Sequence, residues 1–375
     1  MSLGPTVGLI INPIAGMGGA VGLKGTDGAE ILAQARELGA IPRATARTRR
    51  ALSVVAQRYP AMCILTPPGP MGGEVAAQTG FEPKILDQVL PDETSATETV
   101  ASVRQMENAK VDLIVFAGGD GTARVIADEV TQKTPVLGIP CGVKMHSGVF
   151  TTSPEAAGRL MADFVEDKAR VRFREVEILD VDETATRSDL IATCLYGYVR
   201  APFVRRLVQS PKGGGPLADE DAAKAAGAEL AAEMAPGTVY LIGPGTTMRA
   251  ITDALGVEKT LLGVDAVLDG QVIGKDIADQ QITALTARHK AQIFVGVTGG
   301  QGYVLGRGNQ QISAEVIRRV GPDGITIVAS TEKLLALPEP RLLVDTGDSE
   351  LDASLTGYVR VRTGLRQSML MRLES

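Results

Sequence analysis

The sequence predicts an α/β protein with a parallel-sheet N-terminal domain and a second, mixed α/β domain. Short apolar strands alternate with helices along the first half of the 375-residue chain, a pattern that favours a right-handed parallel sheet. Many of the 43 glycines stand in turns directly after expected strands, where α/β proteins bind ligands. With 44% hydrophobic residues, a chain of this length buries two cores. We therefore expect domains over residues 1–165 and 166–375, with the last strands allowed to return to the first domain.

The composition narrows the classes of function. The net charge of −6 suggests neither a nucleic-acid surface nor an anionic-membrane surface. Three cysteines, far apart and without metal-site spacing, indicate ordinary thiols of a reducing cytoplasm. The N-terminus lacks a basic region and a long apolar run, and no stretch reaches the roughly 18 apolar residues of a membrane span. We expect a soluble cytoplasmic protein that forms a homo-oligomer, acts on a small molecule, and binds no nucleic acid and no membrane.

The first half contains the parallel-sheet pattern. Helices are expected over Ala29–Leu38 and over Thr94–Asn108, the latter with Thr94 as its N-cap. The expected strands are Val7–Ile11, Met62–Leu65, Lys84–Val89, Val111–Phe116 and Val136–Ile139. Because parallel strands end at one edge of the sheet, four glycine-bearing loops should collect there. These loops are residues 12–28, 66–73, 117–122 and 140–148.

The second half also alternates, with some antiparallel pairing. Val171–Asp180 and Ile191–Val199 are expected to be longer strands of a mixed sheet. Asp269-Gly270 predicts a hairpin, because this dipeptide suits a two-residue turn. The remaining expected strands are Val239–Ile242, Ile293–Val297, Ile325–Ala329, Leu342–Val344 and Tyr358–Val361. The expected helices are Asp219–Met234, Met248–Leu255 and Ser313–Val320.

The chemistry is expected to centre on the turn AGGDGT, which lies between the strand Val111–Phe116 and a helix beginning near Arg124. Glycines let the backbone approach a ligand, and the helix presents its N-terminal amides and positive dipole end to the turn, which suits a phosphate. A carboxylate there is electrostatically wrong for passive phosphate binding. Asp120 is therefore expected to hold a metal, a hydroxyl or a proton; the alternative is a turn residue that bonds its own backbone.

The chain echoes this turn once. The run Gly119-Asp-Gly-Thr, followed by Arg124, is matched by Gly243-Pro-Gly-Thr, followed by Arg249, one residue longer. The echo reflects either a true repeat or the shared needs of strand–turn–helix units.

The turn GGDGT, together with NPIAG near the N-terminus, resembles the superfamily of NAD kinases and diacylglycerol/sphingosine kinases. The closer resemblance is to bacterial ATP-NAD kinase-like proteins, which include the acetoin-catabolism X (AcoX) group. It extends over essentially the whole chain. The stretches that carry it are INPIAGMGG, VGLKGTDG, TPPGPMGG, AGGDGT, PCGVKMHSGVF, GPGTT, GRGNQQ and VDTGD.

The resemblance implies phosphoryl transfer from ATP, or from polyphosphate, with Mg²⁺, and implies that Asp120 contacts the acceptor hydroxyl. Positioning and charge neutralisation dominate such transfers, so Lys24, Lys144 or arginines of residues 200–212 are candidates to offset phosphate charge. The residues expected to bind the nucleotide are Asn12, Gly16, Gly18, Gly118, Gly119, Gly121 and Thr122. Those expected to bind the acceptor are Lys144, His146, Gly243, Gly245, Thr246, Thr247 and Asn309.

Several of these residues have a second interpretation. Asn12 either binds nucleotide or ends its strand in an Asn-Pro turn. His146 either contacts substrate or is an ordinary loop histidine, and Lys144 is solvated unless its loop faces the cleft. Thr246 and Thr247 either bind phosphate or cap a helix. The carboxylates Asp345, Asp348 and Asp352 are expected to serve turns and caps; the alternative is a metal role.

One departure concerns the acceptor. NAD kinases carry an Asn-Glu pair some tens of residues after GGDGT, and no such pair follows Asp120 here; the nearest substitute is Asn309. NAD and a small diol, keto or sugar-like compound therefore both remain candidate acceptors. A lipid acceptor is disfavoured, because no membrane-binding helix or basic surface run is evident. The non-enzyme alternative is a nucleotide-sensing regulator that keeps the phosphate loops but has lost turnover.

Overall fold

The computed structural model describes residues 4–23, 29–131, 133–142, 145–167, 171–181, 193–203 and 219–375. Among these residues the chain forms two compact units. The first contains the residues up to Met17 and those from Ile41 to Phe203; the second contains Gly18–Ala40 and the residues from Asp219 onward. The units thus divide the chain elsewhere than at the predicted boundary between residues 165 and 166. None of the described helices combines the length and the apolar character that crossing a bilayer requires.

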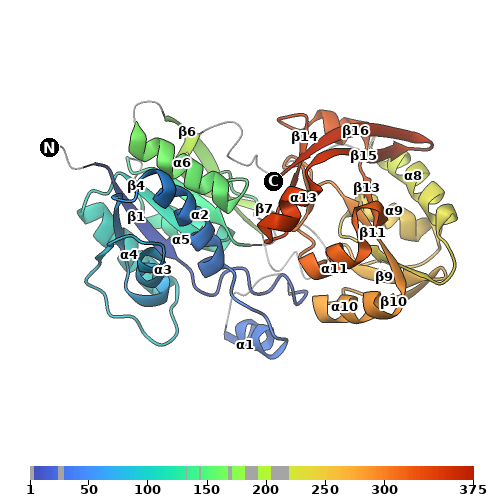
Figure 1. Ribbon diagram of the computed structural model, residues 1–375, viewed down its shortest axis with the longest axis horizontal. Coiled ribbons are helices and arrows are strands. Elements are labelled where there is room, and N and C mark those ends of the chain that lie inside the picture. Colours follow the sequence, from blue (N-terminus) through green and yellow to red (C-terminus); the bar gives the residue numbers. More distant parts are fainter. Residues whose placement is uncertain are drawn as a thin grey trace. The chain divides into compact units, whose positions relative to one another are not determined.

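The first unit is built on a five-stranded sheet in which every pair is parallel, as the alternation of strands and helices predicts. Its order is β3-β2-β1-β4-β5, and its central strands β1 and β4 are labelled in Figure 1. The register aligns Ile11 with Ala117 and Gly118 with Pro140, so the carboxyl ends of β1, β4 and β5 meet at one edge. The strands are β1 (Thr6–Ile11), β2 (Cys63–Thr66), β3 (Lys84–Ile85), β4 (Leu113–Gly118) and β5 (Val136–Pro140).

Helices cover both faces of this sheet. The apolar residues of α2, α3 and α6 pack with one set of strand side chains, including Leu9 and Val115. Those of α4 and α5 pack with the opposite set, including Ile10 and Phe116. This alternation along β1 and β4 is the period of two that a sheet covered on both faces requires. The helices are α2 (Ala44–Arg58), α3 (Gly73–Gln78), α4 (Ala96–Asn108), α5 (Asp120–Glu129) and α6 (Pro154–Glu166), with a short η1 (Gly69–Met71) before α3.

The strands β6 (Arg172–Val181) and β7 (Thr193–Phe203) form a separate antiparallel ribbon. The sequence correctly predicts two long strands here, but they pair with each other and do not join a mixed sheet. Val176 and Val199 bury themselves in the core cluster that contains α5. An ion pair of 3.1 Å between Arg124 of α5 and Asp180 of β6 also links the ribbon to this helix. The ribbon therefore fixes the helix that follows the GGDGT turn.

The second unit has a nine-stranded mixed sheet, in agreement with the predicted mixed α/β domain. Strands β8, β11, β13 and β15 run parallel as consecutive neighbours, and β16 reverses the direction. Asp269 and Gly270 both have positive φ, which confirms the predicted hairpin between β9 and β10. The strands are β8 (Thr238–Ile242), β9 (Asp265–Leu268), β10 (Gln271–Gly274), β11 (Lys290–Gly296), β12 (Tyr303–Leu305), β13 (Ile325–Val328), β14 (Arg341–Val344), β15 (Gly357–Gly364) and β16 (Gln367–Glu374).

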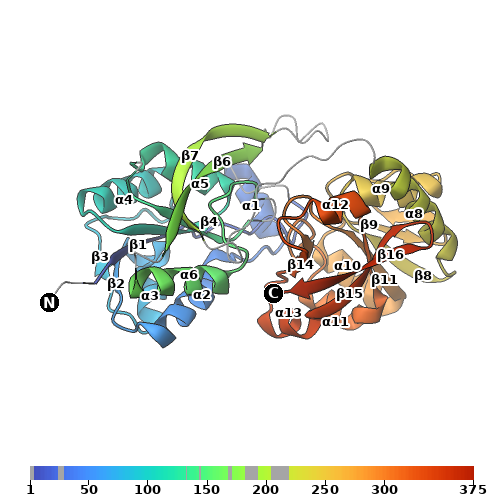
Figure 2. The ribbon, with the colours of Figure 1, turned by 90° about the horizontal axis from the view of Figure 1, so that it is seen from above.

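Helices flank this sheet too (Figure 2). The helices α8 and α9 share one core cluster with Tyr240 and Phe294, while α10, α11 and α13 share another with Leu241 and Val295. The last strands, β14 to β16, belong to this sheet and not to that of the first unit. The helices are α8 (Asp219–Glu233), α9 (Thr246–Ala254), α10 (Asp279–Arg288), α11 (Ala314–Val320), α12 (Thr331–Leu335) and α13 (Ser349–Leu355), with a short η2 (Pro322–Gly324).

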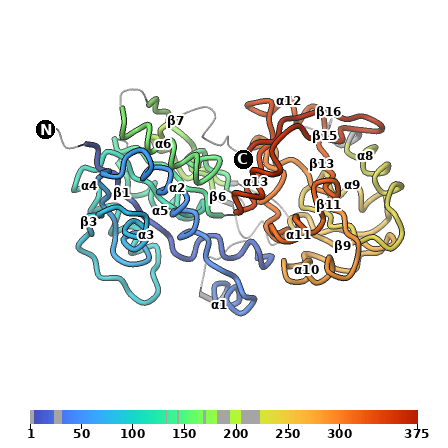
Figure 3. The backbone as a smooth tube through the Cα atoms, viewed as in Figure 1, coloured from blue at the N-terminus to red at the C-terminus, as the bar shows by residue number. Residues whose placement is uncertain are grey.

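An N-terminal segment also belongs to the second unit. Helix α1 (Ala29–Glu37) and residues 18–23 follow β1 in the chain, as the blue part of the tube in Figure 3 shows. The carbonyl of Ala20 accepts a hydrogen bond of 3.0 Å from the amide of Asp279, at the start of α10. The glycine-rich loop 12–28 is thereby divided between the two units.

Three local predictions are corrected. The N-cap of α4 is Ser95 and not Thr94, because Ser95 and Glu98 form a capping box in which the Ser95 amide donates to Glu98 at 2.6 Å. That hydrogen bond lowers the pKa of the Glu98 carboxyl. Strand β3 has two residues, and the expected strand Lys84–Val89 ends early. Helix α2 was not predicted, since its four arginines interrupt the apolar pattern.

Candidate functional site

The loops that follow β1, β4 and β5 are joined by backbone hydrogen bonds at the carboxyl edge of the first sheet. The amide of Asn12 donates to Ala117 at 2.9 Å, and the amide of Cys141 donates to Gly118 at 3.0 Å. The first part of loop 12–28, loop 117–122 and loop 140–148 thus lie together where the parallel sheet predicts them. Gly18, the other predicted phosphate-loop glycine, belongs to the second unit.

Two glycines in these loops are required by close packing. A Cβ on Gly118 would lie 2.6 Å from both Cβ and Oγ1 of Thr122. Gly16 has φ of +82° and packs against the carbonyl of Cys141, where a side chain would clash. Gly119 is the N-cap of α5 and faces Gly142. These glycines let three loops approach closely.

Asn12 and Thr122 link the first loop to the second. The Asn12 side-chain nitrogen donates to the Thr122 hydroxyl at 3.0 Å. The Asn12 side-chain oxygen accepts from the amide of Ile14 at 3.3 Å. Asn12 therefore ends its strand in a turn and also bridges to the GGDGT helix. Through this hydrogen bond the Asn12 side chain reaches the N-terminus of α5, whose first turn contains Thr122 and Gly121.

Asp120 is the first residue of α5 and is only 6% exposed. Its carboxylate does not bond the backbone of its own turn, which was the alternative interpretation. Its Oδ2 accepts the His146 amide at 2.6 Å and lies 3.2 Å from His146 Nδ1. Its Oδ1 accepts the Ser147 amide at 3.1 Å and the Ser147 hydroxyl at 2.6 Å. The carboxylate thus connects the GGDGT turn to loop 140–148.

Two residues at this edge were not predicted from the sequence. Ser147 is fully buried, and its Oγ also accepts from the amide of Leu179 in β6 at 3.0 Å, so one hydroxyl joins Asp120 to the ribbon. Arg47 of α2 is 5% exposed and donates from Nε to the carbonyl of Pro140, at the end of β5. An unpredicted helix supplies Arg47, and Ser147 has no local signal that distinguishes it from other loop serines.

The predicted cations are mostly not part of the described structure. Lys24, Lys144 and residues 204–212 lie outside the described residues. Arg200 is described, and it does not reach the phosphate loops. Its guanidinium donates to the carbonyl of Lys133 at 3.5 Å and stacks on Phe173. Lys133 precedes β5, so Arg200 lies at the amino end of the sheet, opposite the GGDGT turn.

In the second unit, the GPGTT turn joins β8 to α9. Gly245 is the N-cap of α9, has φ of +108° and carries no side-chain cap. Gly243 donates its amide to Phe294 at 2.8 Å, which fixes the turn against β11. Thr246 is exposed and Thr247 is half-buried. Neither hydroxyl is engaged by another described residue, so the N-terminus of α9 is open within this unit.

Asn309 is 4% exposed and stabilises its own loop. Its side-chain oxygen accepts from the amide of Gly306 at 2.8 Å, and its nitrogen donates to the carbonyl of Val304 at 2.9 Å. In this conformation the amide holds the turn after β12, which leaves it poorly placed to act as the predicted substrate ligand. Beside it, Arg307 and Asp345 form an ion pair of 3.4 Å, with both side chains at most 3% exposed.

Asp348 and Asp352 have the cap and turn roles expected of them. Asp348 is the N-cap of α13 and accepts from the amide of Leu351 at 3.0 Å. That bond, together with Arg318, lowers the pKa of the Asp348 carboxyl. Asp352 accepts from both the amide and the hydroxyl of Thr346.

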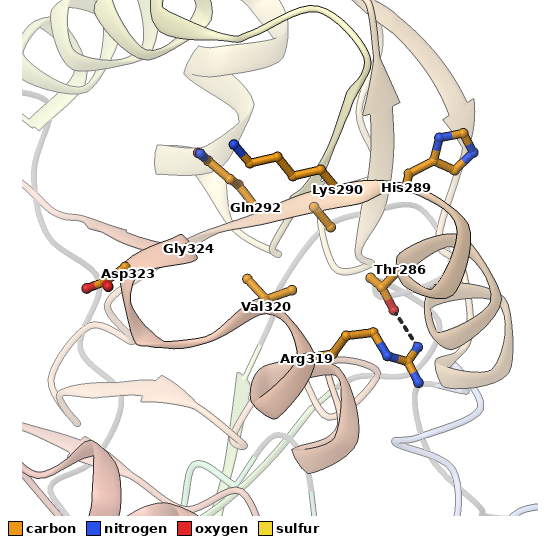
Figure 4. Close-up of a pocket in the computed structure, with 9 residues that line it drawn as sticks. Thr286, His289, Lys290, Gln292, Arg319, Val320, Asp323 and Gly324 are labelled. Carbon is orange, nitrogen blue, oxygen red and sulfur yellow. Dashed lines mark hydrogen bonds between the residues drawn. The ribbon is translucent and has the colours of Figure 1, made fainter.

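Two hollows of the described structure lie away from the GGDGT turn. One hollow of about 360 Å³ lies at the start of β11; Figure 4 shows its Lys290 and Arg319 pointing away from each other. A second, of about 330 Å³, lies at the amino end of β4 and β5. Within the described parts of the chain, no three His, Cys, Asp or Glu side chains form a group able to hold a metal ion.

Two family models match the chain, one in each half. A model of the ATP-NAD kinase N-terminal domain matches residues 7–169, and a model of the ATP-NAD kinase C-terminal domain matches residues 236–373. Neither the curated proteins nor the solved structures gave a match. The first match contains Asn12, Asp120 and Ser147, and the second contains the GPGTT and GRGN turns.

Proposed function

Because the chain belongs to the ATP-NAD kinase family, we propose that it is an ATP-dependent kinase that phosphorylates a hydroxyl group, with NAD as the first acceptor to test. The family supports kinase-like phosphoryl transfer and a small-molecule substrate. The resemblance inferred from GGDGT is thereby confirmed at the level of the family. The AcoX-like subtype, the acceptor and the residue roles are our proposals.

The observation that carries the proposal is the arrangement of three loops around the N-terminus of α5. Phosphoryl transfer needs donors and positive charge around the phosphates more than it needs covalent chemistry. The N-terminal amides of α5 and its dipole supply both at the end of a parallel strand. We propose that the ATP phosphates lie against Gly118, Gly119, Gly121 and Thr122, with Asn12 and Gly16 shaping the neighbouring loop.

Asp120 is proposed as the carboxylate on which proton transfer from the acceptor hydroxyl depends. It is the only acidic residue of the turn, and it is held by residues 146 and 147 rather than by its own backbone. General-base assistance of this kind contributes about 10²–10⁴-fold. Lys144 and His146 would then stand on the acceptor side. The turn of the second unit that contains Gly243, Gly245, Thr246 and Thr247 stays a separate proposal for a substrate-binding turn, through its amides and hydroxyls.

Mg²⁺ fits this site as part of the nucleotide substrate. The described residues contain no cluster of three metal-ligating side chains, and Mg²⁺ commonly binds through substrate phosphates and water with one or two carboxylates. It would neutralise charge on the transferred group. The residues of this chain would orient the phosphates through backbone amides and hold the acceptor hydroxyl near Asp120.

A second acceptor class is favoured by one specific observation. Asn309 is the nearest substitute for the missing Asn-Glu pair, and its side chain is committed to Gly306 and Val304. Without that pair, a small diol, keto or sugar-like acceptor, linked to acetoin-type catabolism, suits the site at least as well as a dinucleotide. A nucleotide-sensing regulator without turnover is the non-enzyme alternative.

The test is ADP release from purified protein with ATP·Mg²⁺, measured with and without NAD, NADH and a panel of small hydroxy compounds. Release that depends on an acceptor, with formation of the phosphorylated acceptor, supports the kinase. Polyphosphate in place of ATP tests the donor. Tight ATP binding with no ADP formation for any acceptor would contradict the kinase and support the regulator.

Two further predictions remain proposals. A homo-oligomer is expected, and light scattering coupled to size exclusion measures its mass. A cytoplasmic location is expected from the three dispersed cysteines; cell fractionation with a tagged full-length chain measures it.

A further inference from the structure

The Asp120 carboxylate has no vacant position for a substrate hydroxyl. Two oxygens of an ionised carboxylate offer about four lone-pair directions. Four donors of loop 145–148 face them: the amides of His146 and Ser147, His146 Nδ1, and the Ser147 hydroxyl, which is 2.6 Å from Asp120 Oδ1 and 2.9 Å from its other acceptor, the carbonyl of Leu179. An acceptor hydroxyl could reach Asp120 only by displacing one of these groups from the carboxylate.

The imidazole of His146 has an open nitrogen beside this carboxylate. Its side chain is 2% exposed, and Nδ1 lies 3.2 Å from Asp120 Oδ2. Since an ionised carboxylate only accepts, the hydrogen-bond network assigns the proton to Nδ1 and leaves a lone pair on Nε2. No described residue bonds to Nε2. This nitrogen is therefore the group in the cluster with bonding capacity to spare.

We infer that His146 is the base that takes the proton of the acceptor hydroxyl, and that Asp120 is a positioning residue that acts through it. The inference rests on the proposed kinase function. The hydroxyl oxygen forms a bond to the γ-phosphorus of ATP as the bond to the β–γ bridging oxygen breaks. The electron pair of that bond leaves with ADP, the hydroxyl proton moves to His146 Nε2, and water later removes it.

The surrounding contacts fix the ring for this task. Ser147, the next residue, bonds both Asp120 and Leu179 of β6, and the amide of Gly148 donates to Glu177 at 3.0 Å. The loop is therefore tied to the ribbon on one side and to α5 on the other. A carboxylate that orients Nδ1–H and leaves Nε2 to accept a proton is the arrangement of Asp–His pairs in other enzymes.

The first test is the variant His146→Asn, whose amide can still donate to Asp120 but has no basic nitrogen. We expect kcat for phosphoryl transfer to fall about 10²–10⁴-fold, with the KM for ATP within about threefold of wild type. The control is His289→Asn, which changes the only other histidine, exposed in the second unit. In His146→Ala, added imidazole should restore part of the lost turnover. A kcat for His146→Asn within threefold of wild type overturns the inference.

The second test separates action through His146 from direct contact by Asp120. If the two residues act in series, Asp120→Asn/His146→Asn should be no more than about threefold slower than His146→Asn alone, because effects of residues that act as a unit are not additive. Losses that multiply in the double variant would show that Asp120 contacts the hydroxyl itself. That result would overturn its assignment as a positioning residue.

The third test does not depend on activity. With only two histidines in the chain, ¹⁵N NMR of histidine-labelled wild-type protein, assigned with His289→Asn, reports the proton on each ring nitrogen. We expect His146 to carry its proton on Nδ1 and to leave Nε2 unprotonated. The opposite tautomer would overturn the inference. Wild-type protein that transfers phosphate to no acceptor would contradict the kinase proposal itself, whereas transfer that survives His146→Asn contradicts only the inference.

Discussion

The turn after β4 and the turn after β8 have the same local design and opposite surroundings. Each follows a buried strand and leads into a helix whose N-cap is a glycine without a side-chain cap, Gly119 or Gly245. The first helical residue is Asp120 in α5 and Thr246 in α9. Asp120 is buried and accepts from residues 146 and 147, whereas Thr246 is exposed and has no partner among the described residues.

The comparison indicates that the local sequence pattern produces each strand–turn–helix unit, whereas contacts with residues distant in sequence determine the chemistry of its first helical residue. The echo between GGDGT and GPGTT predicts two strand–turn–helix units, and both are present. In the first unit, the carbonyl of Gly118 accepts from Cys141 and Thr122 accepts from Asn12, so two neighbouring loops hold the turn. In the second unit, the amides of Gly243 and Gly245 donate to Phe294 and Leu261, but no described residue bonds the Thr246 hydroxyl. A rigid, enclosed turn suits transfer chemistry, and an open helix N-terminus suits recognition of a phosphate or a similar anion.

The largest stability effect should come from the glycine that ends β4. Gly118→Ala would place a methyl group 2.6 Å from Thr122 Cβ, and Thr122 cannot move easily because it is β-branched and buried. We expect a loss of about 3 kcal/mol in the free energy of unfolding, measured in urea. Gly243→Ala is the matched variant, where the nearest atom is 3.1 Å away, and its loss should be smaller. Equal losses would remove the distinction between the two turns.

The next effect should come from Ser147. Ser147→Ala removes the hydroxyl that bonds Asp120 and Leu179, so we expect about 1–2 kcal/mol of destabilisation in thermal or urea unfolding. Hydrogen exchange should also speed up at the Leu179 amide, which loses its acceptor. A fully stable variant with unchanged exchange would mean that this bridge does not hold loop 145–148 to the ribbon.

A smaller effect is expected at Thr122. Thr122→Val keeps the shape of the side chain but removes the oxygen that accepts from Asn12 at 3.0 Å. We expect a loss of about 1 kcal/mol, measured by urea unfolding. Asn12→Ala in the Thr122→Val background should cost less than Asn12→Ala in the wild type, and additive losses would count against a direct link between the two loops.

The smallest effect is expected at the open turn. Thr246→Val should change the free energy of unfolding by no more than about 0.5 kcal/mol, since its hydroxyl is exposed and not engaged by a described residue. Any functional effect should be a rise in KM with little change in kcat. A loss as large as that of Thr122→Val would mean that the second turn is held as firmly as the first.

Most of the fold could be predicted because its strands are short, buried and separated by glycine turns. The segments around Ile10, Ile114 and Leu241 behave as expected. Helix α2 could not be predicted from periodicity, since Arg47 is a buried cation whose partner, the carbonyl of Pro140, is 93 residues away in sequence. Strand β16 was also missed. Its alternation of buried and exposed residues becomes clear only once Met371 and Leu373 are seen in the core.

The candidate site could be predicted only in its local part. GGDGT itself indicates a turn, a helix and a functional carboxylate. The partners of Asp120 lie 26 and 27 residues further along the chain, and no local signal connects them. The same limit applies to Asn309. An Asn side chain can bind a ligand, and no local signal shows that this amide bonds Gly306 and Val304 of its own loop.

The central claim is that phosphoryl transfer takes place at the GGDGT turn, and the most direct measurement compares Asp120→Asn with Thr246→Val in steady-state kinetics. Asp120→Asn should lower kcat at least ~10²-fold while the KM for ATP stays within about threefold, and Thr246→Val should leave kcat nearly unchanged. Asp128→Asn, an exposed aspartate of the same helix, is the control. A loss of less than threefold in kcat for Asp120→Asn, with the variant folded, would contradict the account.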